Sequence, residues 1–301
     1  MVFGNKTLQG GGMLYEFTTF TFHSVGTVGR LGPSLSTLLA SYDTGSNSWL
    51  NNTTFFDCST TITGTQKWRV PVSGNYQITA IGSQGTDGSV TWRGGYGASM
   101  IGTFSLTYGT VLHIVAGQKN NLTGYASGGG ASAVWISTET TPLIVAGGGG
   151  GGNTVTYPTS GYNASTTTSG VGSNGTLTGN GGDDGNGGLG STTNQPGGGC
   201  GWITNGFPGF LTTETGGKTF LSGSAGGLGY TPPTYDGGFG GGGAGFGGGG
   251  GGGGYSGGGA GTYNDPDGSS GGGGGSYNSG TSQTNTISNT YNSGSVTITL
   301  L

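Results

Sequence analysis

The sequence predicts an all-β protein in which an antiparallel β-sandwich carries a large glycine-rich insertion and one short helix precedes it. Three observations predict this fold. Apolar and polar residues alternate along several short runs, 79 of the 301 residues are glycine, and 31 are aromatic (12 Phe, 14 Tyr and 5 Trp). Disordered chains usually carry few aromatic residues and much charge, whereas charged residues make up 6% of this chain. We therefore expect the glycine-rich part to be ordered.

The N-terminal zone, residues 1–67, contains an apolar extended run over residues 14–22 and one short helix. Pro33 is followed by Leu35, Leu38, Leu39 and Tyr42, the spacing of one helical face with proline in the first turn. We expect this zone to attach the protein to neighbouring subunits.

The sandwich zone comprises residues 68–146 and 290–301. Short apolar or alternating runs separated by turn residues are typical of antiparallel strands. The expected strands are residues 76–81, 99–106, 111–116, 133–137, 143–146 and 295–301. The runs 111–116 and 143–146 are apolar at both odd and even positions, so we expect them to be covered on both faces. Because the last strand returns to the same sandwich, residues 147–289 form an insertion.

Long glycine runs in residues 147–289, such as 247–254, cannot form stable helices or ordinary strands. They can adopt the polyproline II conformation, which makes no hydrogen bonds within itself. Because glycine has no Cβ, such segments can approach closely and pair N–H with C=O between neighbours. The sequence therefore predicts a polyproline II bundle. The alternative is a flexible linker, which does not explain the interspersed aromatic residues. Collagen is excluded, because proline is scarce (9 residues) and glycine does not fall on every third position.

No motif indicates catalysis or a bound cofactor. Residues 254–258 fit the G-x-S-x-G pattern, but a nucleophile elbow needs a strand before it, a helix after it and a downstream histidine. Both histidines, His23 and His113, precede it. Lys218 follows a glycine as in a phosphate-binding loop, but the earlier glycine of that motif is replaced by Thr212. We expect neither an enzyme nor a cofactor protein.

Two aspartate pairs are candidate calcium ligands. Asp183 and Asp184, and separately Asp265 and Asp267, lie among turn residues and could supply the oxygen atoms that Ca²⁺ prefers. Aspartate, asparagine and glycine are also ordinary turn formers, so this alternative stays open and no metal site is assigned.

Charge and composition also argue against nucleic acid as a partner and against insertion into a membrane. Seven Lys and Arg residues and a net charge of −4 provide no basic patch for nucleic acid. No run is long and apolar enough for a membrane span, and the first twelve residues do not have the apolar run of a signal peptide. Cys58 and Cys200 are the only cysteines, and we expect them to be unpaired.

Five segments resemble, in this order, the glycine-rich domain in the ectodomain of anaplastic lymphoma kinase and leukocyte tyrosine kinase: residues 68–88, 98–118, 128–152, 237–261 and 294–300. The resemblance implies a TNF-like β-sandwich with an inserted glycine bundle. It does not carry over receptor signalling, because no kinase, membrane span or cysteine-rich module is present.

Aromatic residues between the glycine runs are the best candidates for a functional site. Large rings at loop tips are typical of recognition surfaces. The candidate receptor-binding residues are Trp202, Phe207, Tyr230, Tyr235 and Tyr157. The alternative is that these rings cover the ends or sides of the bundle.

Residues 13–67 are similar to the N-terminal parts of glycine-rich proteins of phages and large viruses, and phage tail-fibre adhesins use glycine bundles with variable tip loops. We therefore expect a virion structural protein, a tail-fibre tip or capsid-surface fibre that binds a host glycan or outer-membrane protein. It would assemble in the host cytoplasm with other virion subunits and with itself, for which a trimer is the candidate assembly, without nucleic acid or membrane insertion. The alternatives are a purely architectural virion or filament subunit and an ice-binding protein.

Overall fold

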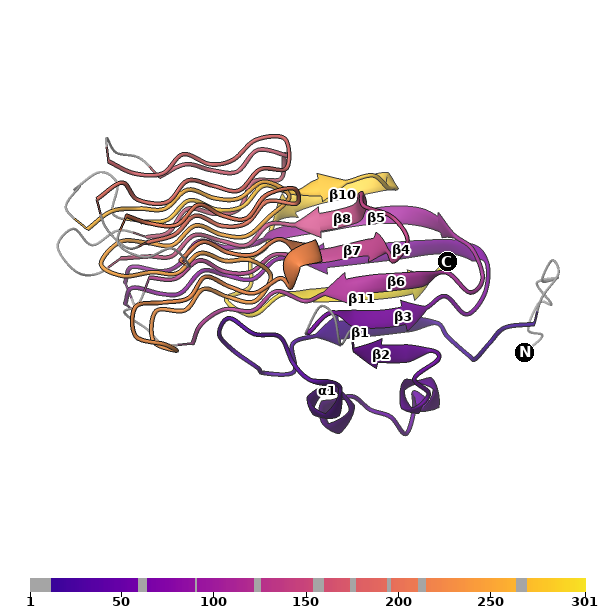
Figure 1. Ribbon diagram of the computed structural model, residues 1–301. Helices are drawn as coiled ribbons and strands as arrows, with labels where there is room; N and C mark the ends of the chain where they lie inside the picture. The colour runs from indigo at the N-terminus through magenta and orange to yellow at the C-terminus, as the bar shows by residue number, and fades with distance from the viewer. Residues whose placement is uncertain are drawn as a thin grey trace.

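The computed structural model describes residues 12–58, 64–89, 91–121, 126–153, 160–173, 177–193, 196–210, 215–263 and 270–301. Two β-sheets form a sandwich at one end of the molecule, and glycine-rich segments run side by side from it to the other end (Figure 1). The predicted all-β class, with antiparallel sheets and one short α-helix in the described residues, is confirmed.

All neighbouring strands in both sheets are antiparallel. The first sheet has the order β1-β11-β4-β5-β10 and the second the order β2-β3-β6-β7-β8-β9. The strands of the first sheet are β1 (Thr19–His23), β4 (Gly74–Ile81), β5 (Ala98–Leu106), β10 (Thr281–Ile287) and β11 (Ser295–Leu300). Those of the second are β2 (Phe56–Cys58), β3 (Gln66–Arg69), β6 (Val111–Val115), β7 (Ser132–Ile136), β8 (Pro142–Ala146) and β9 (Tyr277–Asn278).

The main core lies between the two sheets. Along β4, Tyr76, Ile78 and Ala80 are fully buried while Gln77 is exposed, as the alternation predicts. Aromatic rings fill the side of the core nearest the N-terminal zone, where the Trp68 ring centroid lies 4.9 Å from that of Phe17 and 5.9 Å from that of Tyr76.

A second core covers the outer face of the second sheet. Trp135 and Val145 there pack with Trp202 and Phe220 from the glycine zone. The one-turn helix η2 (Phe220–Ser222) accordingly lies over this sheet near β7 (Figure 1). In β8, Ile144 belongs to the main core and its neighbour Val145 to the second. The expected coverage of this strand on both faces is confirmed.

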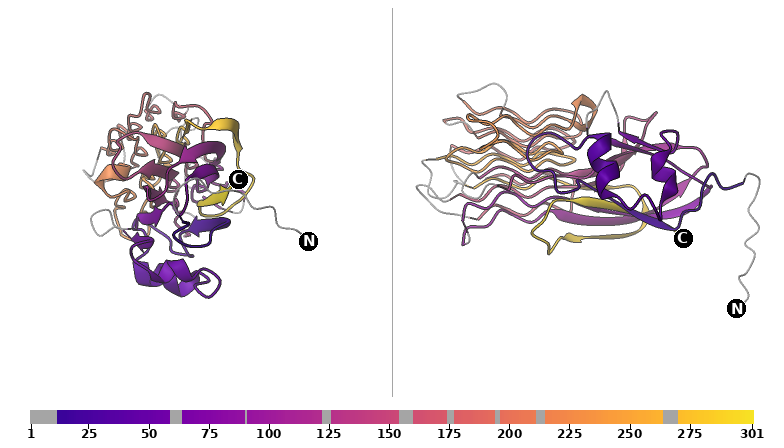
Figure 2. Two further views of the ribbon diagram at one scale, coloured as in Figure 1. Left: turned by 90° about the vertical axis from the view of Figure 1, so that its right-hand side faces the viewer. Right: turned by 90° about the horizontal axis from the view of Figure 1, so that it is seen from below.

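The predicted helix is α1 (Leu35–Ser41), and it lies with the 3-10 helix η1 (Ser48–Asn51) at the β2 edge of the sandwich (Figure 2). The Ser34 side chain caps it by accepting a hydrogen bond from the Thr37 N–H. Leu38 and Tyr42 are buried in the main core, so the helical face that the leucine spacing predicts is the one that packs.

The N-terminal zone is less separate than expected, because it contributes strands to both sheets. β1 pairs with β11, and β2 pairs with β3. The sandwich also extends into the predicted insertion, since β9 pairs with β8 and β10 pairs with β5. Neither strand has an apolar alternation: β9 has two residues, and all seven residues of β10 are exposed.

The glycine zone is built from three connections rather than from one insertion. The β4–β5 and β6–β7 connections enter it together with the long β8–β9 connection. Backbone hydrogen bonds join them: the Gly95 N–H donates to the Gly150 carbonyl at 2.8 Å, and the Gly128 N–H donates to the Gly243 carbonyl at 2.9 Å. These bonds connect segments far apart in the chain, as the bundle hypothesis requires.

Within one glycine run, the bonding partner recurs at every third residue. Six consecutive N–H groups donate to three neighbouring segments in turn: Gly250 and Gly253 to Ala126 and Gly129, Gly251 and Gly254 to Gly197 and Cys200, and Gly252 and Tyr255 to Gly272 and Gly275. A helix with three residues per turn points every third N–H in the same direction. The polyproline II conformation stays a prediction, and this three-residue period is the observation that supports it.

Side chains have no room inside this zone. A Cβ on Gly252 would lie 2.1 Å from the Gly148 carbonyl oxygen, and one on Gly251 would lie 2.0 Å from that of Gly258. Both contacts are with backbone, which cannot rotate away as a side chain can. Glycine is therefore required at these positions by the close approach of neighbouring segments.

We expect Gly252→Ala to lower the free energy of unfolding by about 1–3 kcal/mol or more, because the added methyl group overpacks the zone against backbone. Gly172→Ala is the matched control in the same zone. Its Cβ would meet the nearest atom, the Gly181 nitrogen, at an ordinary 3.4 Å, so we expect no loss of stability. Urea unfolding of both variants measures the difference, and equal stabilities would contradict the close packing.

Candidate functional site

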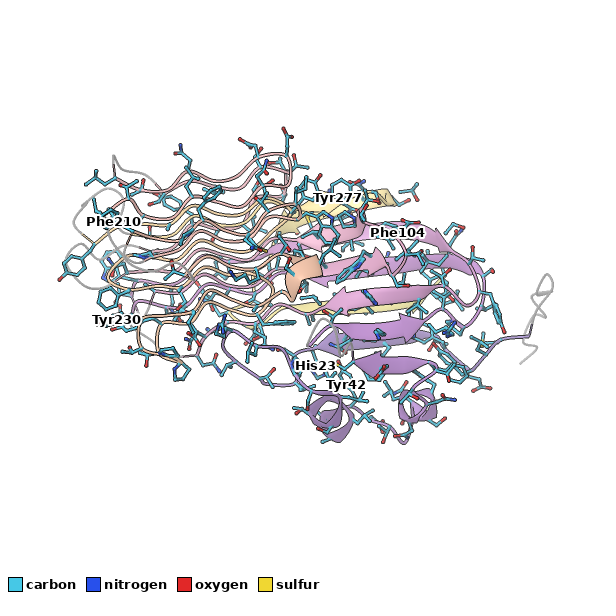
Figure 3. The ribbon with its side chains drawn as sticks, viewed as in Figure 1. His23, Tyr42, Phe104, Phe210, Tyr230 and Tyr277 are labelled. Atoms are coloured by element: carbon cyan, nitrogen blue, oxygen red, sulfur yellow. The ribbon has the colours of Figure 1, made fainter. Side chains whose placement is uncertain are left out.

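Exposed aromatic rings gather at the end of the glycine zone that lies away from the sandwich. Phe210 is 73% exposed, Tyr230 61% and Phe207 50%. Figure 3 shows Phe210 and Tyr230 at this end, which we call the distal end. No core of the described chain covers these three rings, so their apolar surface is available to a partner.

The loop that carries Tyr230, residues 229–236, is fixed at its base. The Gly229 N–H donates to the Asp236 carboxylate at 2.8 Å. The buried side-chain amide of Asn120 donates to the carbonyls of Pro233 at 3.0 Å and Asp236 at 3.1 Å. The Ser127 hydroxyl donates to the Tyr235 carbonyl at 3.2 Å. These bonds hold the loop in one conformation while the Tyr230 ring remains in solvent.

Two of the predicted residues belong to one aromatic group. The Phe246 ring lies 5.0 Å from that of Tyr235, edge to face, and 5.7 Å from that of Tyr230. Tyr235 and Phe246 are half-buried, so they support the more exposed Tyr230. Phe207 comes from a separate extended segment, where its N–H donates to the Gly188 carbonyl at 2.9 Å and its carbonyl accepts from the Gly198 N–H at 2.9 Å.

Trp202 does not lie on an exposed tip, contrary to the expectation for a receptor-binding residue. It is 6% exposed, and its ring stacks on Phe220 at 5.1 Å and meets Trp135 edge to face at 5.6 Å. Its indole N–H donates to the Thr140 carbonyl. The burial supports the alternative weighed for these rings, that they cover part of the bundle, because Trp202 joins the glycine zone to the second sheet.

Trp202 does line one wall of a pocket of about 450 Å³ at the junction between the sandwich and the glycine zone. Ile203 and Leu221 are exposed at this pocket, and Tyr255 and Tyr277 stack on each other in its lining at 4.8 Å. Sequence reasoning missed Ile203 and Leu221, because a single aliphatic residue after an aromatic one carries no periodic signal.

Tyr157, Asp265 and Asp267 lie outside the described residues. Asp183 and Asp184 are both exposed, and the described residues contain no cluster of three or more His, Cys, Asp or Glu side chains placed to hold a metal ion.

The groups considered for catalysis are held in structural roles. Ser256, of the G-x-S-x-G pattern, is fully buried, and its hydroxyl accepts a hydrogen bond from the Gly185 N–H at 3.1 Å. His113 packs edge to face on Trp135 at 5.1 Å, and burial lowers its pKa. Cys58 and Cys200 are unpaired and buried, as expected, and burial raises the pKa of the Cys200 thiol to about 12.

No protein-family model matches the chain. Among the described residues, no helix has the length and apolar character that crossing a membrane requires.

We expect Trp202→Ala to lower the free energy of unfolding by about 3–5 kcal/mol, the usual cost of removing a buried large aromatic side chain. Its neighbour Ile203 is 65% exposed, so Ile203→Ala should change stability by no more than about 0.5 kcal/mol. Denaturant unfolding compares the two variants. A near-neutral Trp202→Ala would contradict the packing role.

The Asp236 carboxyl predicts a pH dependence of stability. Burial raises its pKa above the ordinary value, and the Gly229 N–H and Arg30 offset this only in part. Its contribution to stability is therefore complete below the unfolded pKa of about 3.9 and is lost as pH rises through the folded pKa. Asp236→Asn cannot ionise but can still accept from Gly229. We expect it to be more stable than the parent near neutral pH and equally stable at about pH 3. Urea unfolding at both pH values measures this, and a pH-independent difference would contradict it.

Proposed function

We propose that the protein is a non-enzymatic attachment protein that presents aromatic loops to a host surface, as a tail-fibre tip or capsid-surface fibre of a virion does. The observation that carries the proposal is the exposure of Phe210 and Tyr230 at the distal end of a hydrogen-bonded glycine scaffold, with Phe207 also exposed on that scaffold. Aromatic residues in such positions commonly dominate the binding energy of interfaces.

The scaffold supports this function because it fixes the loops before binding. A loop that is already ordered loses less conformational entropy when it binds a ligand. The Tyr230 loop meets this condition through Asn120, Ser127 and Asp236, which are all buried and bonded to its backbone. The segments beneath it are joined by lateral backbone bonds, so a force on the loop is distributed over several neighbours.

The positions of the first and last described segments also support a fibre-tip role. The Leu14 N–H donates to the Pro71 carbonyl at 3.0 Å, and the Leu301 N–H donates to the Asn75 carbonyl at 2.9 Å. Pro71 precedes β4 and Asn75 lies at its start, and β4 then runs toward the glycine zone. The first and last described segments thus meet at the end of the sandwich opposite the aromatic loops (Figure 1). Neighbouring subunits, including further copies in a trimer, would attach there and leave the distal end free.

The ligand that fits best is a saccharide or an outer-membrane protein recognised by ring stacking and shape. Phe207, Phe210 and Tyr230 are aromatic rather than acidic or basic residues, and the chain carries few charges overall. Stacking on aromatic faces contributes binding energy without ion pairs.

The architectural alternative is favoured by β10. This strand lies at an edge of the first sheet, its seven side chains are all exposed, and none is charged. An uncharged exposed edge is suited to pairing with another chain. A filament subunit could use this edge without any receptor.

The ice-binding alternative has one supporting observation, on the outer face of the first sheet. The hydroxyls of Thr19 and Thr299 lie 2.9 Å apart, as do those of Thr21 and Thr297. A regular threonine face is what ice binding needs. However, sheets twist by roughly 20–25° per strand, which disrupts a flat array across five strands, so we rank this alternative lowest.

We expect Tyr230→Ala and Phe210→Ala each to weaken retention of the purified protein by host cells by about 30-fold, the effect of losing one binding hot spot of about 2 kcal/mol. Tyr108→Ala is the matched control, because Tyr108 is exposed in the β5–β6 turn at the opposite end of the sandwich. Competition with whole particles for cells measures retention, and circular dichroism checks folding. Folded variants that compete as well as the parent would favour the architectural alternative.

A further inference from the structure

A second pocket, of about 340 Å³, lies where the N-terminal zone, the β6–β7 connection and the β10–β11 connection meet. It is near the end of β1, at the His23 side chain that Figure 3 labels. We call it the Lys119 pocket. Its lining contains two residues with a basic side chain, Lys119 and His23, and no acidic residue.

Lys119 is a half-buried cation without a carboxylate partner in the described chain. Its ammonium donates one hydrogen bond, to the side-chain oxygen of Gln84 at 3.1 Å. An ammonium has three donors, so two remain for other groups. The two ion pairs among the described residues, Lys67–Asp57 and Arg93–Asp87, do not include it.

The nearby carboxylate, Asp87, is already engaged. One of its oxygens accepts from the Gln84 amide at 2.6 Å and from the Gly94 N–H at 2.9 Å, and the other faces Arg93 at 3.4 Å. Because Gln84 donates to Asp87, its carbonyl oxygen is directed at Lys119. Gln84 is fully buried, which fixes this orientation. Asp87 is thus bonded to Gln84, Gly94 and Arg93 and makes no ion pair with the Lys119 ammonium.

Burial lowers the pKa of Lys119, the neighbouring Arg93 lowers it further, and Asp87 partly offsets this. The charged form of this lysine is therefore costly without a ligand, and an anion bound beside it would recover part of that cost. The other charge-bearing group in the lining, His23, accepts a hydrogen bond at Nδ1 from the Val25 N–H, and burial lowers its pKa too. Near neutral pH, Lys119 is the cation that an anionic ligand would meet.

We propose that the Lys119 pocket binds an acidic sugar, with Lys119 facing its carboxylate and the surrounding hydroxyl and amide side chains facing its hydroxyl groups. A single lysine matches a single negative charge. Ser24, Asn121 and Ser293 supply neutral donors and acceptors of the kind that bind sugar hydroxyls. Tyr291, whose ring lies 4.4 Å from that of Tyr96 and 4.9 Å from the Arg93 guanidinium carbon, borders the pocket. This site is separate from the distal loops and does not depend on them.

Isothermal titration calorimetry on the full chain tests the proposal with sodium glucuronate, with glucose as the uncharged counterpart and with sodium sulfate as a bare anion. We expect glucuronate to bind at least about tenfold more tightly than either probe, since only glucuronate offers both a negative charge to Lys119 and hydroxyl groups to the neighbouring side chains, and hydrogen bonds to charged groups are the stronger ones. Added salt should weaken its binding. If glucose bound equally well, the role assigned to the charge would be wrong. If sulfate bound equally well, the role assigned to the sugar hydroxyl groups would be wrong.

Three variants locate the site. Lys119→Met should abolish the preference for glucuronate. Lys67→Met removes the same charge from the second sheet, where Lys67 is ion-paired to Asp57, and should leave binding unchanged. Ser293→Leu fills the pocket without touching Lys119 and should also abolish binding, so it decides the question if Lys119→Met does not fold. Binding that survives Ser293→Leu in a folded protein would overturn the proposal.

Tyr230→Ala separates this inference from the proposed function. It should leave glucuronate binding intact even though it weakens attachment. Loss of glucuronate binding in a folded Tyr230→Ala protein would place the sugar at the distal end and overturn the Lys119 pocket.

Discussion

The lateral hydrogen bond between backbones without side chains is the constraint on which the rest of the structure depends. In an ordinary domain, apolar side chains hold the elements together and the backbone bonds are local. In the glycine zone each N–H donates to a different segment, in a cycle of three around Gly250–Tyr255. A Cβ on Gly252 would lie 2.1 Å from the carbonyl oxygen of Gly148, which belongs to a fourth segment. The peptide groups themselves hold neighbouring segments together, because glycine has no side chain that would keep the segments apart.

This constraint explains why the sandwich and the glycine zone form one body. The strands β4, β6 and β8 continue directly into the zone, so the register of the sheets sets the spacing of the first glycine segments. Trp202 and Phe220 then pack back onto the outer face of the second sheet. Side-chain packing thus fixes the position of the zone relative to the sandwich, while backbone bonding holds the zone itself together.

Much of this fold could be predicted from the sequence because its strongest signals are local. The alternation at Tyr76, Ile78 and Ala80 and the spacing of Leu35, Leu38 and Tyr42 each identify one element and its buried face. β10 could not be predicted in this way, because its side chains are polar on both faces and exposed. The participation of the β4–β5 and β6–β7 connections is a property of long-range backbone pairing, to which no side-chain pattern corresponds.

The sequence indicated that aromatic residues form the candidate site, but it did not show which of these residues are exposed. Tyr230 and Phe207 are exposed, whereas Trp202, with the same kind of sequence surroundings, is buried against Trp135 and Phe220. What separates them is contact with the second sheet, which a glycine-rich sequence does not encode locally. The surroundings of Lys119 likewise depend on Gln84 and Asp87, which lie on a different connection.

The scarcity of apolar surface inside the glycine zone has a thermal consequence. Exposing apolar surface raises the heat capacity on unfolding, and exposing polar surface lowers it. Away from the rings that pack on the second sheet, melting the glycine zone exposes mainly peptide groups, so that part adds little to the heat capacity. Its free energy then changes nearly linearly with temperature, without the curvature that leads apolar cores to cold denaturation. The far end of the molecule is thereby built to keep its shape in the cold.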